Sequence, residues 1–147
     1  MNKRKTATKG WCITQLDWTR YDRRNRAIHH PVPDPSWEQV LSAIMSLDGG
    51  RQSDMFFEAA NGNMMCIGGG NGRFVVCTLT SRDSSTGVAA HLINPTAGDE
   101  VREGVVVGGC QTDITERYIV DSPITLKAAE TFFLTGELES TLEWEPY

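Results

Sequence analysis

Short apolar runs dominate the chain, and such runs predict β-strands. Residues 55–60 and 63–67 flank an Asn-Gly pair at 61–62, the dipeptide that most strongly favours a two-residue hairpin turn. A glycine-rich stretch at 68–72 interrupts the pattern before the apolar run at 73–80. The same pattern predicts further strands at residues 11–18, 88–93, 101–107 and 115–120. The order of these strands predicts an antiparallel meander.

One segment after three closely spaced prolines has helical spacing instead. Asp34 or Ser36 can cap this helix, and Ser36 and Gln39 have the spacing of a capping box. Two glycines at 49–50 end it, because glycine accepts the left-handed conformation that follows many helices. Its apolar face consists of Trp37, Val40, Leu41, Ile44 and Leu47.

A second helix is expected near the C-terminus. Ser122 is its expected cap, Pro123 suits its first turn, and Gly136 ends it. Its inner face consists of Leu126, Ala129, Phe132 and Phe133. The sequence therefore predicts an α+β fold, with two helices packed on one face of an antiparallel sheet of about six to seven strands.

Length and composition add limits to this picture. The chain has 147 residues, enough for one domain, which we place at residues 11–147 after a basic, flexible N-terminal arm at 1–10. No apolar run approaches the roughly 20 residues that a membrane span needs. The positive N-terminus lacks the apolar stretch of a signal peptide. We therefore expect a cytoplasmic protein.

The charges are unevenly distributed along the chain. Residues 1–26 carry eight Lys or Arg and two Asp, whereas residues 27–147 carry six Lys or Arg and seventeen Asp or Glu. An acidic body repels nucleic acid and attracts basic partners. The basic start is either a solvated tail or a nucleic-acid contact, and the residues concerned are Lys3, Arg4, Lys5, Lys9, Arg20, Arg23, Arg24 and Arg26.

The sequence contains no recognisable catalytic, metal or cofactor motif. The glycines at 68–72 lack the following Lys-Ser or Lys-Thr of a phosphate-binding loop. The adjacent His29 and His30 would point apart on a regular element. The four cysteines lack the short paired spacing of a zinc site and are expected as free buried thiols: Cys12, Cys66, Cys77 and Cys110. We expect no cofactor, no metal and no catalytic residue.

An enzyme acting on a small molecule is a further possible function, beside nucleic-acid binding. It would use Cys66, Cys77 or His91, the residues with reactive groups that lie in strand-like runs. A deep pocket joining two of these residues would favour this possibility, and well-packed surroundings would weigh against it.

Several segments together resemble the Imm1 family of immunity proteins from bacterial polymorphic toxin systems. The resemblance covers roughly residues 11–145 and leaves out the basic arm. It rests on the order and spacing of five segments: the tryptophan-bearing stretch 11–18, the helix from Pro35-Ser36-Trp37 to Leu47-Asp48-Gly49-Gly50, the block 68–76, the Gly108-Gly109 step, and Phe132-Phe133 with Gly136 and Leu142-Glu143-Trp144. These residues are of the kind that form turns, a core and a docked tail.

The resemblance implies a protein that acts by binding. Such proteins neutralise a cognate toxin domain, often a nucleic-acid deaminase, in the cytoplasm of the cell that produces it. A one-to-one complex with the toxin is expected, with no membrane and no direct nucleic-acid partner. An acidic protein can occupy the basic substrate groove of such a toxin. The candidate toxin-binding residues are the acidic loop residues Asp48, Asp83, Asp99, Glu100, Glu103 and Asp113.

Overall fold

The protein is described by a computed structural model over residues 12–79, 89–107 and 110–146; of residues 101–104, 107 and 110–111 it describes the backbone alone. The elements are β1 (Ile13–Tyr21), β2 (Ala27–Pro33), α2 (Trp37–Met45), β3 (Asp54–Ala59), β4 (Met64–Gly70), β5 (Arg73–Leu79), β6 (Ala90–Leu92), β7 (Val101–Val107), β8 (Cys110–Thr115), a 3-10 turn η1 (Glu116–Tyr118), α3 (Ser122–Thr135) and β9 (Trp144–Pro146).

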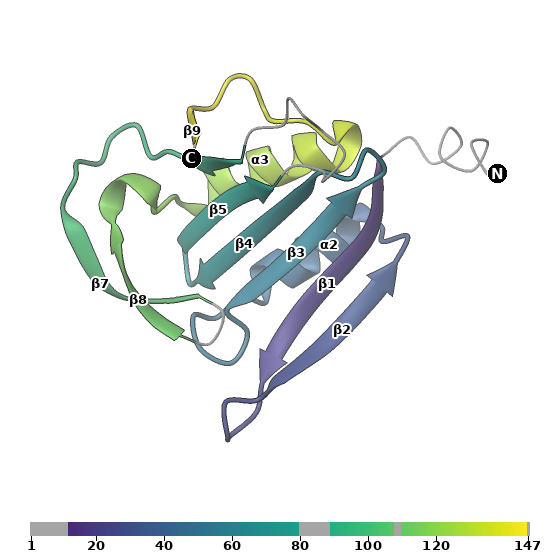
Figure 1. Cartoon of the computed structure of the whole chain (residues 1–147), viewed down its shortest axis with the longest axis horizontal. Helices are drawn as coiled ribbons and strands as arrows, with labels where there is room; N and C mark the ends of the chain where they lie inside the picture. The colour runs from purple at the N-terminus through teal and green to yellow at the C-terminus, as the bar shows by residue number, and fades with distance from the viewer. Residues whose placement is uncertain (1–11, 80–88, 108–109, 147) are drawn as a thin grey trace.

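Seven strands form one antiparallel sheet in the order β2-β1-β3-β4-β5-β6-β9, and β7 pairs with β8 as a separate two-stranded sheet. Both helices lie behind the large sheet in Figure 1, so they cover the same face of it. The predicted α+β architecture, with two helices on one face of an antiparallel sheet, is confirmed.

The core lies between the helices and the covered face of the sheet. Phe57 of β3 and Phe132 of α3 meet edge to face, with ring centroids 5.2 Å apart. Trp37 of α2 and Phe133 of α3 join the two helices, with ring centroids 5.5 Å apart. Val40 and Ile44 of α2 are fully buried against this cluster. The predicted apolar faces of both helices therefore meet the sheet, although Leu41 is not part of the core cluster. The predicted end of the first helix at Gly49–Gly50 is wrong: α2 ends at Met45 with Ser46 as its C-cap, and the buried Leu47 lies beyond it.

Side-chain caps begin both helices. Ser36 and Gln39 form the predicted capping box at the start of α2. Asp121, rather than the predicted Ser122, caps α3 by accepting a hydrogen bond from Ile124 N at 3.1 Å. Ser122 is instead the first helical residue, because the longer Asp121 side chain reaches the free N–H groups from one position earlier. Gly136 ends α3 with φ +73°, as predicted.

The glycine-rich stretch at 68–72 does not break the sheet where the sequence suggested. Residues 68–70 continue β4, and Asn71 and Gly72 alone form the turn into β5, with φ values of +55° and +80°. Gly70 is required for a different reason. A Cβ atom there would lie 2.4 Å from Gly49 N, so only glycine lets the loop after α2 approach β4.

The predicted strand at 115–120 is wrong. The strand in this region is β8, which ends at Thr115 and is followed by η1. Val120 leaves the β7–β8 sheet and pairs with Phe74 of β5, where its backbone N–H donates to Phe74 O at 2.8 Å. Burial of Val120 in the core outweighs the local strand pattern. Two strands that the sequence did not reveal, β2 and β9, form the edges of the large sheet.

Candidate functional site: an acidic ribbon

Carboxylates gather on residues 99–116, a segment that we call the acidic ribbon. The segment contains β7 and β8 and extends to one side of the large sheet (Figure 1). It has five carboxylates and one arginine, and therefore a net charge of −4. The carboxylates belong to Asp99, Glu100, Glu103, Asp113 and Glu116. Four of the six predicted toxin-binding residues are thus brought together on one unit.

A β-bulge lies in the middle of the ribbon. Arg102 pairs with Ile114 and Val105 pairs with Thr112, so two residues of β7 face the single residue Asp113 of β8. These two residues are 103 and 104, and the backbone of Glu103 therefore lies opposite that of Asp113. Bulges bend and twist a ribbon and change the direction of its side chains. The bulge places two of the predicted residues at the same level of the ribbon.

One buried side chain packs the ribbon against the large sheet, and one hydrogen bond joins the two ends of the ribbon. Val105 is buried, with 4% of its surface exposed, and packs at the β4–β5 turn. Glu116 N donates a hydrogen bond of 2.7 Å to Glu100 O, which closes the open end of the strand pair. The side chains of Glu100 and Asp113 are exposed, whereas that of Glu116 is half-buried. Three of the described carboxylates therefore face solvent: Asp99, Glu100 and Asp113.

Asp99 is the most exposed of the described carboxylates for which an ion pair is seen. Its side chain is 85% exposed and lies 3.9 Å from Arg117 Nη1. Arg117 also approaches Glu145 of β9 at 3.4 Å. Tyr118 OH donates to the same Glu145 at 2.8 Å, and this hydrogen bond raises the pKa of Tyr118. An exposed ion pair of this length contributes little to stability, so Asp99 can exchange Arg117 for a partner's cation.

The remaining predicted residues lie outside the ribbon. The Asp48 carboxylate accepts hydrogen bonds from Gly50 N at 2.8 Å and Gln52 N at 3.1 Å, so it shapes the loop after α2. Asp48 nevertheless shares a hollow of about 140 Å³ with Val105 of β7, and so borders the ribbon. Asp83 lies outside the described residues. Glu116 was not singled out from sequence, because residues 115–120 were expected to be a strand.

A larger hollow of about 450 Å³ lies at the root of the ribbon. Its lining consists of Arg73, Asn94, Thr96, Ala97, Glu116 and Ile119. Asn94 is used structurally there: its Nδ2 donates to Ile119 O at 3.0 Å and its Oδ1 accepts from Thr96 N at 3.1 Å. The lining therefore offers one cation and one carboxylate on a framework of internal hydrogen bonds. No reactive side chain is concentrated in it.

The residues of the enzyme alternative lie elsewhere, on the sheet face opposite the helices. Cys66, Cys77 and His91 are direct neighbours in one row across β4, β5 and β6. A hydrogen bond with Cys77 and burial raise the pKa of Cys66, so its thiol stays protonated at neutral pH. Burial lowers the pKa of His91. The hollows at the ribbon are lined by other residues, and neither joins two members of this row.

Cys12, Cys66 and Cys77 are free thiols, as expected, but each is half-buried rather than buried. Among the residues that the structure describes, no three His, Cys, Asp or Glu side chains are placed to share a metal ion. In the same part of the chain, neither helix is long and apolar enough to cross a membrane.

Comparison with known families gives one match. The model of the family described as immunity protein Imm1 matches residues 28–146. Searches of curated proteins and of solved structures found no match. The family match covers most of the chain, including the whole acidic ribbon, and begins within β2. The chain therefore belongs to the Imm1 family of immunity proteins.

Proposed function

We propose that this Imm1 protein neutralises a cognate toxin domain by placing the acidic ribbon in the toxin's basic substrate groove. The observation that carries the proposal is the grouping of five carboxylates and a single arginine within residues 99–116, on the β7–β8 pair and the residues that directly flank it. A toxin that acts on nucleic acid needs a basic groove for phosphates. The ribbon offers the opposite charge.

The class of the partner is suggested by the resemblance to Imm1 proteins, whose toxins are often nucleic-acid deaminases. We propose a nucleic-acid deaminase bound one to one in the cytoplasm, and inhibition by occlusion of its active site. The protein itself needs no cofactor or catalytic residue for this function, because exclusion of substrate requires only a stable complex. Electrostatic complementarity would mainly raise the association rate, by about 10- to 1000-fold.

The test starts by recovering the toxin domain from a lysate of the native host with the tagged protein as bait. Association of the two purified proteins is then measured over a range of salt concentrations. The ribbon variant is Asp99→Asn, Glu100→Gln and Asp113→Asn; the control is Glu38→Gln, Glu130→Gln and Glu143→Gln. All six side chains are exposed, so both variants remove three exposed negative charges.

We expect the ribbon variant to associate at least about tenfold more slowly at low salt, and the control to stay within about twofold of the unchanged protein. Equal rates for the two variants would exclude the ribbon as the contact. A toxin that still binds nucleic acid while in the complex would exclude occlusion. A recovered domain that cleaves nucleic acid instead of deaminating it would overturn the proposed deaminase alone.

A further inference from the structure

The second concentration of charge lies at the turn between β1 and β2. Residues 20–26, which we call the arginine turn, contain four arginines and one carboxylate, and therefore have a net charge of +3. The arginines are Arg20, Arg23, Arg24 and Arg26, and all four are exposed. In Figure 1 the turn lies at the bottom, whereas the yellow C-terminal segment after α3, with its four glutamates at 137–145, lies at the top.

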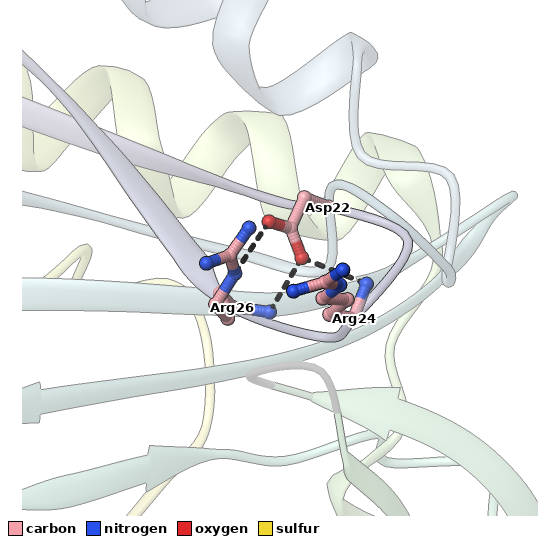
Figure 2. Close-up of polar contacts among 3 residues, drawn as sticks. All are labelled: Asp22, Arg24 and Arg26. Atoms are coloured by element: carbon pink, nitrogen blue, oxygen red, sulfur yellow. Dashed lines mark hydrogen bonds and ion pairs between the residues drawn. The ribbon is translucent and has the colours of Figure 1, made fainter.

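Asp22 fixes the shape of the arginine turn. Its Oδ1 accepts hydrogen bonds from Arg24 N at 2.8 Å and Arg26 N at 2.9 Å, and its Oδ2 accepts from Arg26 Nε at 2.9 Å (Figure 2). Asn25 takes a positive φ of +57°, a conformation that asparagine tolerates well. The single carboxylate is thus used to hold the backbone, and it neutralises only one of the four guanidinium groups.

The other three arginines are available to a ligand. Within the described residues, Arg20, Arg23 and Arg24 have no ion-pair partner, and the Arg26 side chain remains 70% exposed beside Asp22. At about 3.3 Å per residue, the four arginines lie within roughly 10 Å of the turn along the two strands. This is a dense, shaped cluster of positive charge.

The composition of the turn indicates the kind of ligand. Many protein interfaces have an apolar centre from which water is excluded. The only largely apolar side chain in residues 20–26 is that of Tyr21, which is half-buried and bonded to Asp54. Binding here would rest mainly on charge, as does binding to a nucleic-acid backbone. The planar guanidinium group can hold a phosphate through two hydrogen bonds, and a two-stranded ribbon fits the major groove of a duplex.

We propose that the arginine turn binds the phosphate backbone of nucleic acid without reading its sequence. This goes beyond the proposed function, because the family match begins at residue 28 and leaves the turn out. The net charge of −5 argues against a nucleic-acid contact anywhere on the protein, but this total includes a local positive surface at residues 20–26. Nucleic-acid binding and toxin neutralisation then use different parts of the molecule.

Removing residues 1–26 is unsuitable as a test, because it deletes β1 and the buried Ile13 and Leu16. The test therefore uses the full chain with side-chain substitutions in place of a deletion. A fluorescently labelled 20-base-pair DNA duplex is titrated with the protein between 50 and 200 mM salt, without any toxin. Three phosphate contacts predict a slope of about −2.7 in log K against log salt, and about 40-fold weaker binding at the higher salt.

The turn variant is Arg23→Gln with Arg24→Gln, and the control is Arg73→Gln with Lys127→Gln, which also removes two exposed cations. The turn variant should reduce the slope to about −0.9, so that the same change in salt weakens binding only about 3.5-fold. The control should keep the original slope. Circular dichroism verifies that both variants are folded.

Three results would overturn the proposal. The first is no binding of the duplex at 50 mM salt. The second is that the turn variant keeps the original salt slope, whereas a variant in which Lys3, Arg4, Lys5 and Lys9 become Gln loses it. That result would assign duplex binding to the N-terminal segment. The third is that the unchanged protein does not bind the duplex, whereas the turn variant binds the recovered toxin domain more weakly than the unchanged protein does. That result would place the arginine turn in the toxin interface.

Discussion

Two antiparallel ribbons of this molecule have opposite charges and are attached to it differently. The arginine turn joins β1 and β2, and β1 is paired along its length with β3 inside the seven-stranded sheet. The acidic ribbon is a separate sheet whose buried anchor is Val105 at the β4–β5 turn. One ribbon therefore belongs to the cooperative core, whereas the other is a lightly attached unit.

The comparison shows how a protein with a net charge of −5 can present both signs of charge. The two charge types lie on different segments, residues 20–26 and 99–116, so attraction at one site is not cancelled by repulsion at the same site. At physiological salt, exposed charges separated by more than about 8 Å are largely screened from each other. Local charge, rather than the total, therefore decides what each ribbon can bind.

The largest expected effects come from truncating the buried side chain that supports each ribbon. Leu16 of β1 is 1% exposed, and Leu16→Ala should lower the free energy of unfolding of the whole domain by about 3 kcal/mol. Val105→Ala removes two methyl groups and should cost about 1.5 kcal/mol. We expect this loss to act on the attachment of the acidic ribbon, because Val105 lies outside the helix-covered core.

Hydrogen exchange of backbone amides separates the two effects. Leu16→Ala should speed exchange in β1, β3, β4 and α3 together, whereas Val105→Ala should speed exchange in β7 and β8 alone. If Val105→Ala also exposes the amides of β3 and β4, the acidic ribbon is part of the cooperative core. The contrast in attachment would then be incorrect.

The fold was largely predictable from sequence, because its signals are local. Ser36 and Gln39 form a capping box, Gly136 ends a helix, and residues 61–62 lie in the hairpin loop between β3 and β4, each through contacts with near neighbours. The failures involve distant contacts. Val120 does not belong to the predicted strand, because its backbone pairs with that of Phe74, 46 positions earlier in the chain. No local pattern contains that information.

The candidate site was predictable in kind but not in arrangement. Acidic composition pointed to Asp99, Glu100, Glu103 and Asp113, yet only the β7–β8 register shows that a bulge sets Glu103 opposite Asp113. Asp48 looked equivalent in sequence, but its carboxylate holds the Gly50 and Gln52 amides. Whether a carboxylate serves the loop or faces a partner depends on backbone geometry that composition does not record.

A smaller effect is expected near the turn of the β1–β2 hairpin, where Asp54 of β3 pairs with Thr19 of β1. Burial raises the pKa of Asp54, whereas a hydrogen bond from Tyr21 OH at 3.0 Å and the nearby His29 oppose the rise; the charge of Asp17 adds to it. A carboxyl group with a raised pKa binds its proton more tightly in the folded state. Ionisation of Asp54 therefore reduces stability as the pH rises from about 3.8.

Asp54→Asn keeps an oxygen that can accept the Tyr21 hydrogen bond and removes the charge. We expect a gain of at most about 0.5 kcal/mol at neutral pH. The variant should also lose part of the decrease in stability that the unchanged protein shows above pH 4. Urea unfolding at several pH values measures both effects. A loss of stability at pH 7 would show instead that the Asp54 charge has a favourable partner.

The smallest effect, with the opposite sign, is expected at Asp22 in the arginine turn. Its hydrogen bonds from the Arg26 and Arg24 backbone lower its pKa, so its contribution is present above the ordinary value of 3.8 and is lost as the pH falls through the lowered value. Asp22→Ala should speed exchange of the Arg24 and Arg26 amides while leaving the core amides unchanged. In the unchanged protein, acidification should have the same local result. If the Arg24 and Arg26 amides remain protected from exchange in Asp22→Ala, then strand pairing, rather than the carboxylate, holds the arginines together.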